Sequence, residues 1–154
     1  MSLKPLNLLL ADDDFDDRYF FREALETLPL STSLIAVQDG EQLIHLLSKG
    51  TSELPDAVFL DLNMPRKNGF ECLSEIKLNE KLNQIPVIIF STSFDHNVVN
   101  LLYKNGAKYF IHKPADFSQL IRAIQEALTL ITNETFSQPS RENFVLTGQT
   151  SLLN

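Results

Sequence analysis

Four short apolar runs along the chain each end on a polar side chain. The runs cover residues 6–11, 57–60, 87–90 and 109–112, and segments with a helical repeat separate them. Continuous apolar runs of four to six residues between helical segments are typical of buried strands in a parallel sheet. The residues that follow the four runs are Asp12, Asp61, Ser91 and Lys113.

The segments between these runs repeat apolar side chains at helical spacing. Such repeats fall within residues 20–28, 43–47, 70–76, 98–102 and 117–131. They indicate helices with one buried face. Residues 33–37 are read as one further strand, so strand and helix patterns alternate five times. This alternation predicts an α/β domain: a doubly wound, five-stranded parallel sheet flanked by five helices.

The helical repeat stops after Thr132. We therefore expect one domain over residues 1–132 and a polar C-terminal tail over residues 133–154, which is too short to be an output domain. Within that tail only residues 144–146 are locally apolar. A docked strand or helix at these residues is the alternative.

Acidic residues stand where helices are expected to begin. Asp14, Asp16 and Asp17 are all candidates to cap the first helix or to favour its N-terminal dipole. Asp116 with Gln119 three residues later is typical of a capping box at the start of the last helix.

Composition limits the classes of function. The chain has 154 residues and a formal net charge of −7, which argues against a nucleic-acid partner because such proteins usually present a basic face. The single cysteine, Cys72, excludes an internal disulfide framework. No apolar stretch approaches the roughly 20 residues needed to span a bilayer. We therefore expect a cytoplasmic, acidic, single-domain protein with no membrane partner.

Asp61 is the candidate nucleophile of the chain. In a sheet of this kind, ligands bind in the crevice beyond the carboxyl ends of the strands, where Asp61 is expected. The next helix starts several residues later, so helix capping explains this aspartate poorly. A carboxylate can take up a phosphoryl group and form an acyl phosphate.

The other strand-end residues supply what such a transfer needs. Asp12 and Asp13 would repel each other and Asp61 unless a hard cation joined them, and Mg²⁺ favours oxygen ligands. Lys113 is a candidate positive charge for the three phosphoryl oxygens, and the Ser91 hydroxyl can donate to one of them.

These residues stand in recognisable motifs. The motifs are Leu-Ala-Asp-Asp-Asp at 10–14, Asp-Leu-Asn-Met-Pro at 61–65 with Gly69, Ser-Thr at 91–92, and Lys-Pro at 113–114. On these motifs the chain resembles the receiver domain of two-component response regulators over about residues 6–131. Residues 14–17 and 113–117 are similar to the stand-alone branch that includes regulators of phytochrome kinases. The resemblance implies a flavodoxin-like fold with strand order 2-1-3-4-5.

The resemblance also implies roles for the site residues. Asp61 would accept a phosphoryl group from a histidine kinase or histidine phosphotransfer protein. Mg²⁺ or Mn²⁺ would be bound by Asp13, Asp61 and the backbone carbonyl of Asn63, with Asp12 acting through water. Ser91 and Lys113 would contact the phosphoryl group. The protein would not be an enzyme beyond catalysing its own phosphorylation and dephosphorylation.

Further residues are expected to transmit and time the signal. Phe110 stands at the aromatic switch position of the family, and we expect it to turn inward when Ser91 moves toward the phosphoryl group. This would change a surface of the fourth helix, fifth strand and fifth helix that binds a downstream protein. Asn63 and Ser93 are expected to tune dephosphorylation, and the resemblance suggests a cis peptide bond before Pro114. Monomer and homodimer both stay open.

Two other functions compete with this interpretation. A hydrolase of the haloacid-dehalogenase type also uses a strand-end aspartate and Mg²⁺, but it needs a second aspartate where this chain has Asn63, and room for a cap domain. A binding module that has the receiver fold without phosphorylation is the other alternative. The complete set of acidic, hydroxyl and lysine positions argues against it.

Overall fold

The computed structural model describes residues 4–49, 53–133 and 137–148. Its strands are β1 (Leu6–Ala11), β2 (Thr32–Val37), β3 (Ala57–Leu60), β4 (Val87–Ser91), β5 (Tyr109–His112) and β6 (Val145–Leu146). Its helices are α1 (Phe15–Thr27), α2 (Gly40–Ser48), α3 (Gly69–Leu78), α4 (His96–Lys104) and α5 (Phe117–Asn133), with a short 3₁₀ helix, η1 (Arg141–Asn143).

The strands form one parallel sheet in the order β2-β1-β3-β4-β5-β6. The predicted α/β fold, with strand order 2-1-3-4-5 and five α-helices, is confirmed. The structure adds a sixth strand, β6, which pairs with β5. This strand comes from the region predicted to be a polar tail, at the residues where a docked strand was the alternative.

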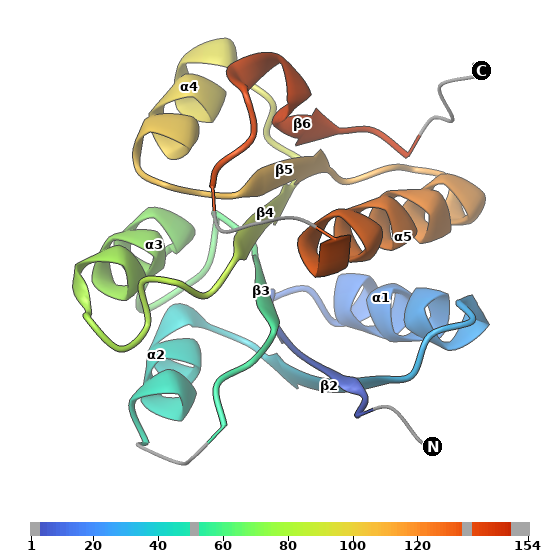
Figure 1. Ribbon diagram of the computed structural model, residues 1–154, viewed down its shortest axis with the longest axis horizontal. Helices are drawn as coiled ribbons and strands as arrows, with labels where there is room; N and C mark the ends of the chain where they lie inside the picture. Colours follow the sequence, from blue (N-terminus) through green and yellow to red (C-terminus); the bar gives the residue numbers. More distant parts are fainter. Residues whose placement is uncertain (1–3, 50–52, 134–136, 149–154) are drawn as a thin grey trace.

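Helices cover both faces of the sheet. Helices α1 and α5 pack together on one face, and α2, α3 and α4 lie on the other (Figure 1). Each face has its own apolar core. Every residue of β3 and β4 is buried, which explains why these strands appear in the sequence as unbroken apolar runs.

The helix starts follow local hydrogen bonding. Of the three candidate caps of α1, Asp14 is the one that accepts from a backbone amide, that of Asp17, at 2.9 Å. The predicted capping box at α5 is wrong. Asp116 does accept from Ser118 N, but the side-chain amide of Gln119 donates to Thr147 O at 2.6 Å. Among the described residues, Asp116 N donates no hydrogen bond to the Gln119 side-chain oxygen, so the reciprocal half of the box is absent.

Candidate functional site

The carboxyl ends of four strands meet as the sequence predicts. The Lys113 Nζ, just beyond β5, lies 2.8 Å from Asp12 Oδ2 beyond β1 and 3.5 Å from Asp61 Oδ2 beyond β3. Ser91, the last residue of β4, is fully buried beside them. Residues up to a hundred positions apart in the chain therefore form one site.

Backbone contacts fix the position of Asp61. Its amide donates to Ala11 O at 2.9 Å, and its Oδ1 accepts from the amide of Leu62 at 2.8 Å. Helix α3 begins against the same segment. A Cβ at Gly69 would lie 2.3 Å from Asp61 O, a distance that real structures do not tolerate. Glycine is therefore required there for α3 to approach the strand end so closely.

Asp12 is held below the surface with one oxygen unsatisfied. Its Oδ1 accepts from the amide of Asp14 at 3.0 Å. Its Oδ2 is fully buried and lies at ion-pair distance from Lys113, but among the described residues no donor is aligned with it for a hydrogen bond. The Lys113 ammonium offsets part of the cost of burying this carboxylate, and a further cation or a water would complete the surroundings of Oδ2.

Three carboxylates are placed to hold a metal ion. Oxygen atoms of Asp12, Asp13 and Asp61 all lie within 4.8 Å of one another, and Asp13 is exposed to solvent. A set of oxygen ligands with an open side fits Mg²⁺ or Mn²⁺, which usually keep several waters. The fourth predicted ligand, the backbone carbonyl of Asn63, follows Asp61 closely in the chain. The side chain of Asn63 donates to Ser93 Oγ at 3.4 Å.

The surroundings of the site raise the pKa values of Asp12, Asp61 and Lys113. Burial raises the pKa of Asp12 to about 6, although Lys113 acts against this. Burial also raises the pKa of Asp61. Burial alone would lower the pKa of Lys113, but its carboxylate neighbours outweigh that effect and raise it. One lysine thus faces an excess of negative charge, which a divalent cation would neutralise.

Asp17 is a site residue that the sequence reasoning missed. Its Oδ2 lies 2.7 Å from Lys113 Nζ, closer than Asp61. From the sequence alone, Asp17 is a candidate only for the cap or the N-terminal dipole of α1. The available signal was the position of Asp17 in the first turn of α1, a few residues after Asp12 and Asp13. That turn begins at the same edge of the sheet as the site.

The predicted switch residue, Phe110, is already inside the molecule. It is fully buried, with its ring centroid 5.9 Å from that of Phe94. Phe94, which the sequence analysis did not single out, also stacks on His112 at 5.0 Å. Ser91 Oγ accepts from the amide of Ser93 at 3.1 Å. The Phe110 ring already packs against Phe94 and Phe144, and its movement on phosphorylation stays a prediction.

The peptide bond between Lys113 and Pro114 is trans, as are all other described peptide bonds. The cis bond suggested by the resemblance is thus not observed. A trans bond is the usual form, because the trans isomer is favoured by about 0.5–1 kcal/mol even before proline.

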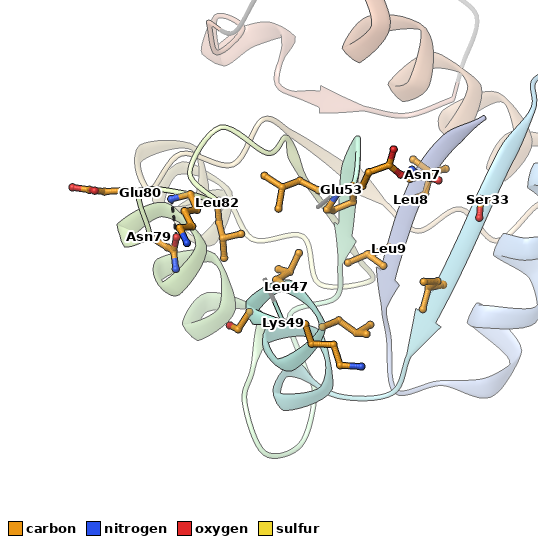
Figure 2. Close-up of a pocket in the computed structure, with 16 residues that line it drawn as sticks. Asn7, Leu8, Leu9, Ser33, Leu47, Lys49, Glu53, Asn79, Glu80 and Leu82 are labelled. Atoms are coloured by element: carbon orange, nitrogen blue, oxygen red, sulfur yellow. Dashed lines mark hydrogen bonds between the residues drawn. The ribbon is translucent and has the colours of Figure 1, made fainter. Parts of the chain in front are cut away.

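A pocket of about 1040 Å³ lies away from these residues, among the ends of α2 and α3 and the first residues of the sheet strands (Figure 2). Leu9, Leu47 and Leu82 supply apolar walls, and Lys49 and Glu80 stand at its rim. None of the predicted site residues lines it. Among the described residues, no helix is both long and apolar enough to cross a membrane.

Comparison with known families agrees with this geometry. Residues 8–125 match the model of the response regulator receiver domain. The chain belongs to this family. Receiver domains act in two-component signalling, and this one has their flavodoxin-like fold.

Several relatives are similar over most of their length. Response regulator Rcp1 of Synechocystis sp. is 31% identical over 128 residues, which cover 80% of this chain and 87% of that protein. A probable methanogenesis regulatory protein, FilR2 of Methanothrix harundinacea, is 31% identical over 79% of this chain and 81% of its own length.

Solved structures of similar receiver domains include a phytochrome response regulator and response regulator Rcp1. The phosphorylated cyanobacterial phytochrome response regulator RcpA aligns with a TM-score of 0.78 at 28% identity, covering 89% of this chain and 100% of that one. The Mn²⁺-bound form of Rcp1 aligns with a TM-score of 0.75 at 28% identity, covering 88% and 100%. The match thus includes one neighbour with a phosphoryl group and one with a divalent metal.

Proposed function

We propose that this protein is a single-domain response regulator that takes up a phosphoryl group on Asp61 in a reaction that depends on Mg²⁺ or Mn²⁺. The observation that carries the proposal is the placement of Asp61. Its carboxylate lies within 4.8 Å of oxygens of Asp12 and Asp13 and 3.5 Å from Lys113 Nζ. Nucleophile, metal ligands and a fixed cation therefore share one site.

The chemistry follows from these positions. A carboxylate oxygen of Asp61 attacks the phosphorus of a phosphohistidine, the P–N bond breaks, and the imidazole leaves. Lys113 pairs with the transferred oxygens, and the Ser91 hydroxyl donates to one of them. A divalent cation bound by Asp12, Asp13 and Asp61 would neutralise the charge that builds up. Apart from promoting its own phosphorylation and dephosphorylation, the protein is not an enzyme in this proposal.

The phosphodonor is proposed to be a histidine kinase or a histidine phosphotransfer protein. The similarity to regulators named for phytochrome supports a kinase of the phytochrome type. Exposed aromatic side chains flank the acceptor site on the α1–α5 side: Phe15, Phe20 and Phe117 are 70%, 47% and 40% exposed. Such side chains at the rim of a charged site are suited to the core of a protein interface.

Hydrolase activity is a weaker candidate on this geometry. A haloacid-dehalogenase-type enzyme needs a general acid two residues after its nucleophile. The side chain at that position, Asn63, is an amide that is not acidic enough to transfer a proton, and its Nδ2 donates a hydrogen bond to Ser93 Oγ. We propose instead that Asn63 and Ser93 flank the water that removes the phosphoryl group and so set the lifetime of the phosphorylated state.

The proposal is tested by intact-mass measurement. Wild-type protein incubated with Mg²⁺ and phosphoramidate or acetyl phosphate is expected to gain one phosphoryl group. Asp61→Asn is expected to gain none, and EDTA should prevent uptake by the wild type. Asp16→Asn is the matched control, because it also removes a carboxylate from this end of the molecule. An adduct on Asp61→Asn would contradict the proposal, as would no adduct on wild type when beryllofluoride titration also shows no binding.

A further inference from the structure

The described C-terminal segment, residues 137–148, lies across α4, β5 and α5, and we name it the strap. Figure 1 shows it in red beside β5, between α4 and α5. The amide of Phe110 donates to Phe144 O at 3.0 Å, and β6 continues the sheet in parallel with β5. Phe144 is fully buried, with its ring centroid 5.1 Å from that of Tyr103 and 6.4 Å from that of Phe110.

Polar contacts fasten the strap on both sides of β5. On the α4 side, Tyr103 Oη donates to Pro139 O at 2.6 Å, and Gln138 Nε2 donates to the carbonyls of Tyr103 and Ala107, each at 2.7 Å. On the α5 side, the side chains of Gln119 and Arg122 donate to Thr147 O at 2.6 Å and Gly148 O at 2.8 Å. The strap is therefore bound like a peptide ligand, with strand pairing, one aromatic anchor and polar ends.

This binding mode occupies the surface through which the protein is proposed to signal. The resemblance to receiver domains implies that a downstream protein binds a surface of α4, β5 and α5, and the strap lies on that surface. We propose that the strap is an internal ligand of this face, and that phosphorylation of Asp61 releases it so that a downstream protein can pair with β5. This inference rests on the proposed function. It adds that the strap is the segment that competes with the downstream protein for this surface.

A continuous set of contacts joins the acceptor site to the strap. When Ser91 turns its hydroxyl toward the phosphoryl group, it gives up the hydrogen bond from Ser93 N. The connection between β4 and α4 then moves toward the site and takes Phe94 with it. Phe94 packs on Phe110, and Phe110 packs on Phe144. Loss of the Phe94 contact leaves the Phe110 ring free to shift toward α4, which weakens the support under the anchor Phe144.

The structure also defines what a competing partner must offer. It must present an extended segment that runs parallel to β5 and accepts a hydrogen bond from Phe110 N. It must also place an aromatic or large apolar side chain between Tyr103 and Phe110. The partner is thus expected to bind by adding a strand, and it cannot occupy this place while the strap does.

The test is amide hydrogen exchange on the full chain, with and without Mg²⁺ and beryllofluoride. Binding of beryllofluoride is checked separately by its ¹⁹F signal. Exchange in the peptide covering residues 137–148, and at Phe110 N, is expected to rise severalfold on binding, while exchange in β1 and β3 stays unchanged. Asp61→Asn, treated in the same way, should show no change.

Two variants distinguish release of the strap from a general loss of structure. Phe144→Ala removes the anchor and should give fast exchange in both states, but it also opens the core. Gln138→Ala removes two hydrogen bonds, from the strap to Tyr103 of α4 and to Ala107 between α4 and β5, without touching the core, and should raise exchange only in the strap. Gln84→Ala is its matched control, because this exposed glutamine donates to Asn83.

The outcomes are distinct. If beryllofluoride binds at Asp61 and strap exchange stays the same or slows, the strap proposal is wrong and the proposed function stands. If beryllofluoride does not bind and no phosphoryl group is taken up, both are wrong.

Discussion

The two ends of the parallel sheet differ in what they enclose. At the carboxyl ends, the side chains of Asp12, Asp61 and Lys113 are largely buried, and an oxygen of each carboxylate lies within 3.5 Å of Lys113 Nζ. At the other end, a pocket of about 1040 Å³ has apolar walls such as Leu47 and exposed charges only at its rim. The candidate site of this protein thus lies where opposite charges are buried together. The large pocket at the other end of the sheet is not lined by these charged residues.

The difference follows from the direction of the chain. Each of the helices α1 to α5 follows a strand of the parallel sheet in the chain, so their N-termini gather at the carboxyl edge. Helix N-termini carry partial positive charge and free amide groups, which favour anions. The same edge therefore suits both the carboxylates and a transferred phosphoryl group, whereas the opposite edge receives helix C-termini.

The largest expected effect is on the rate of phosphoryl uptake, and it compares one lysine at each end of the sheet. Lys113→Met should slow phosphoryl uptake from phosphoramidate about 100-fold, because it removes the fixed positive charge beside the transferred oxygens. Lys49→Met, at the rim of the pocket, should leave the rate unchanged. Rates are followed by intact mass at fixed Mg²⁺. Similar rates for Lys113→Met and wild type would show that this lysine does not stabilise the transfer.

The second prediction concerns stability. Leu47→Ala should lower the free energy of unfolding by about 2 kcal/mol, through lost apolar burial and a partly open cavity, because Leu47 is only 7% exposed. Its folded form should still take up one phosphoryl group. Leu54→Ala, at a 44% exposed position of the same pocket, should change stability by less than about 0.5 kcal/mol. Urea unfolding measures both, and loss of uptake in folded Leu47→Ala would show that the two ends are coupled.

The third prediction concerns the lifetime of the phosphorylated state. Asn63→Ala and Ser93→Ala should each change the rate of dephosphorylation about two- to tenfold, the range expected when one hydrogen bond to a transition state is lost. The change is measured as the decay of phosphoprotein after the donor is removed. Ser33→Ala, at the pocket, is the control. Decay equal to wild type in both site variants would remove these residues from the mechanism.

The smallest prediction concerns Asp17. This carboxylate pairs with Lys113 and competes with the phosphoryl group for it, so Asp17→Asn should speed phosphoryl uptake about two- to fivefold, as expected for a partly exposed ion pair. Asp16→Asn should leave the rate as it is. Slower uptake in Asp17→Asn would mean that Asp17 orients Lys113 for the reaction instead of holding it back.

The sequence predicted the strands, the helices and the members of the site because these depend on local patterns, whereas the strand order was implied by the resemblance to receiver domains. Buried strands appear as apolar runs, and a parallel sheet brings their ends together whatever their spacing in the chain. Contacts between distant segments left no such pattern. Asp17 turns toward Lys113 because of the rotation of α1, and Gln119 bonds to Thr147 because the strap is there. The docked strand at β6 was visible only as three apolar residues in a polar region.

The sixth strand also bears on how the molecule is made. Until Val145 and Leu146 pair with it, β5 is an open edge strand with three buried apolar or aromatic residues, Tyr109, Phe110 and Ile111. Open apolar edges are templates for aggregation. A nascent chain that has folded only as far as α5 exposes this edge, so synthesis past Leu146 closes it. Variants shortened before β6 are therefore expected to be prone to self-association during expression.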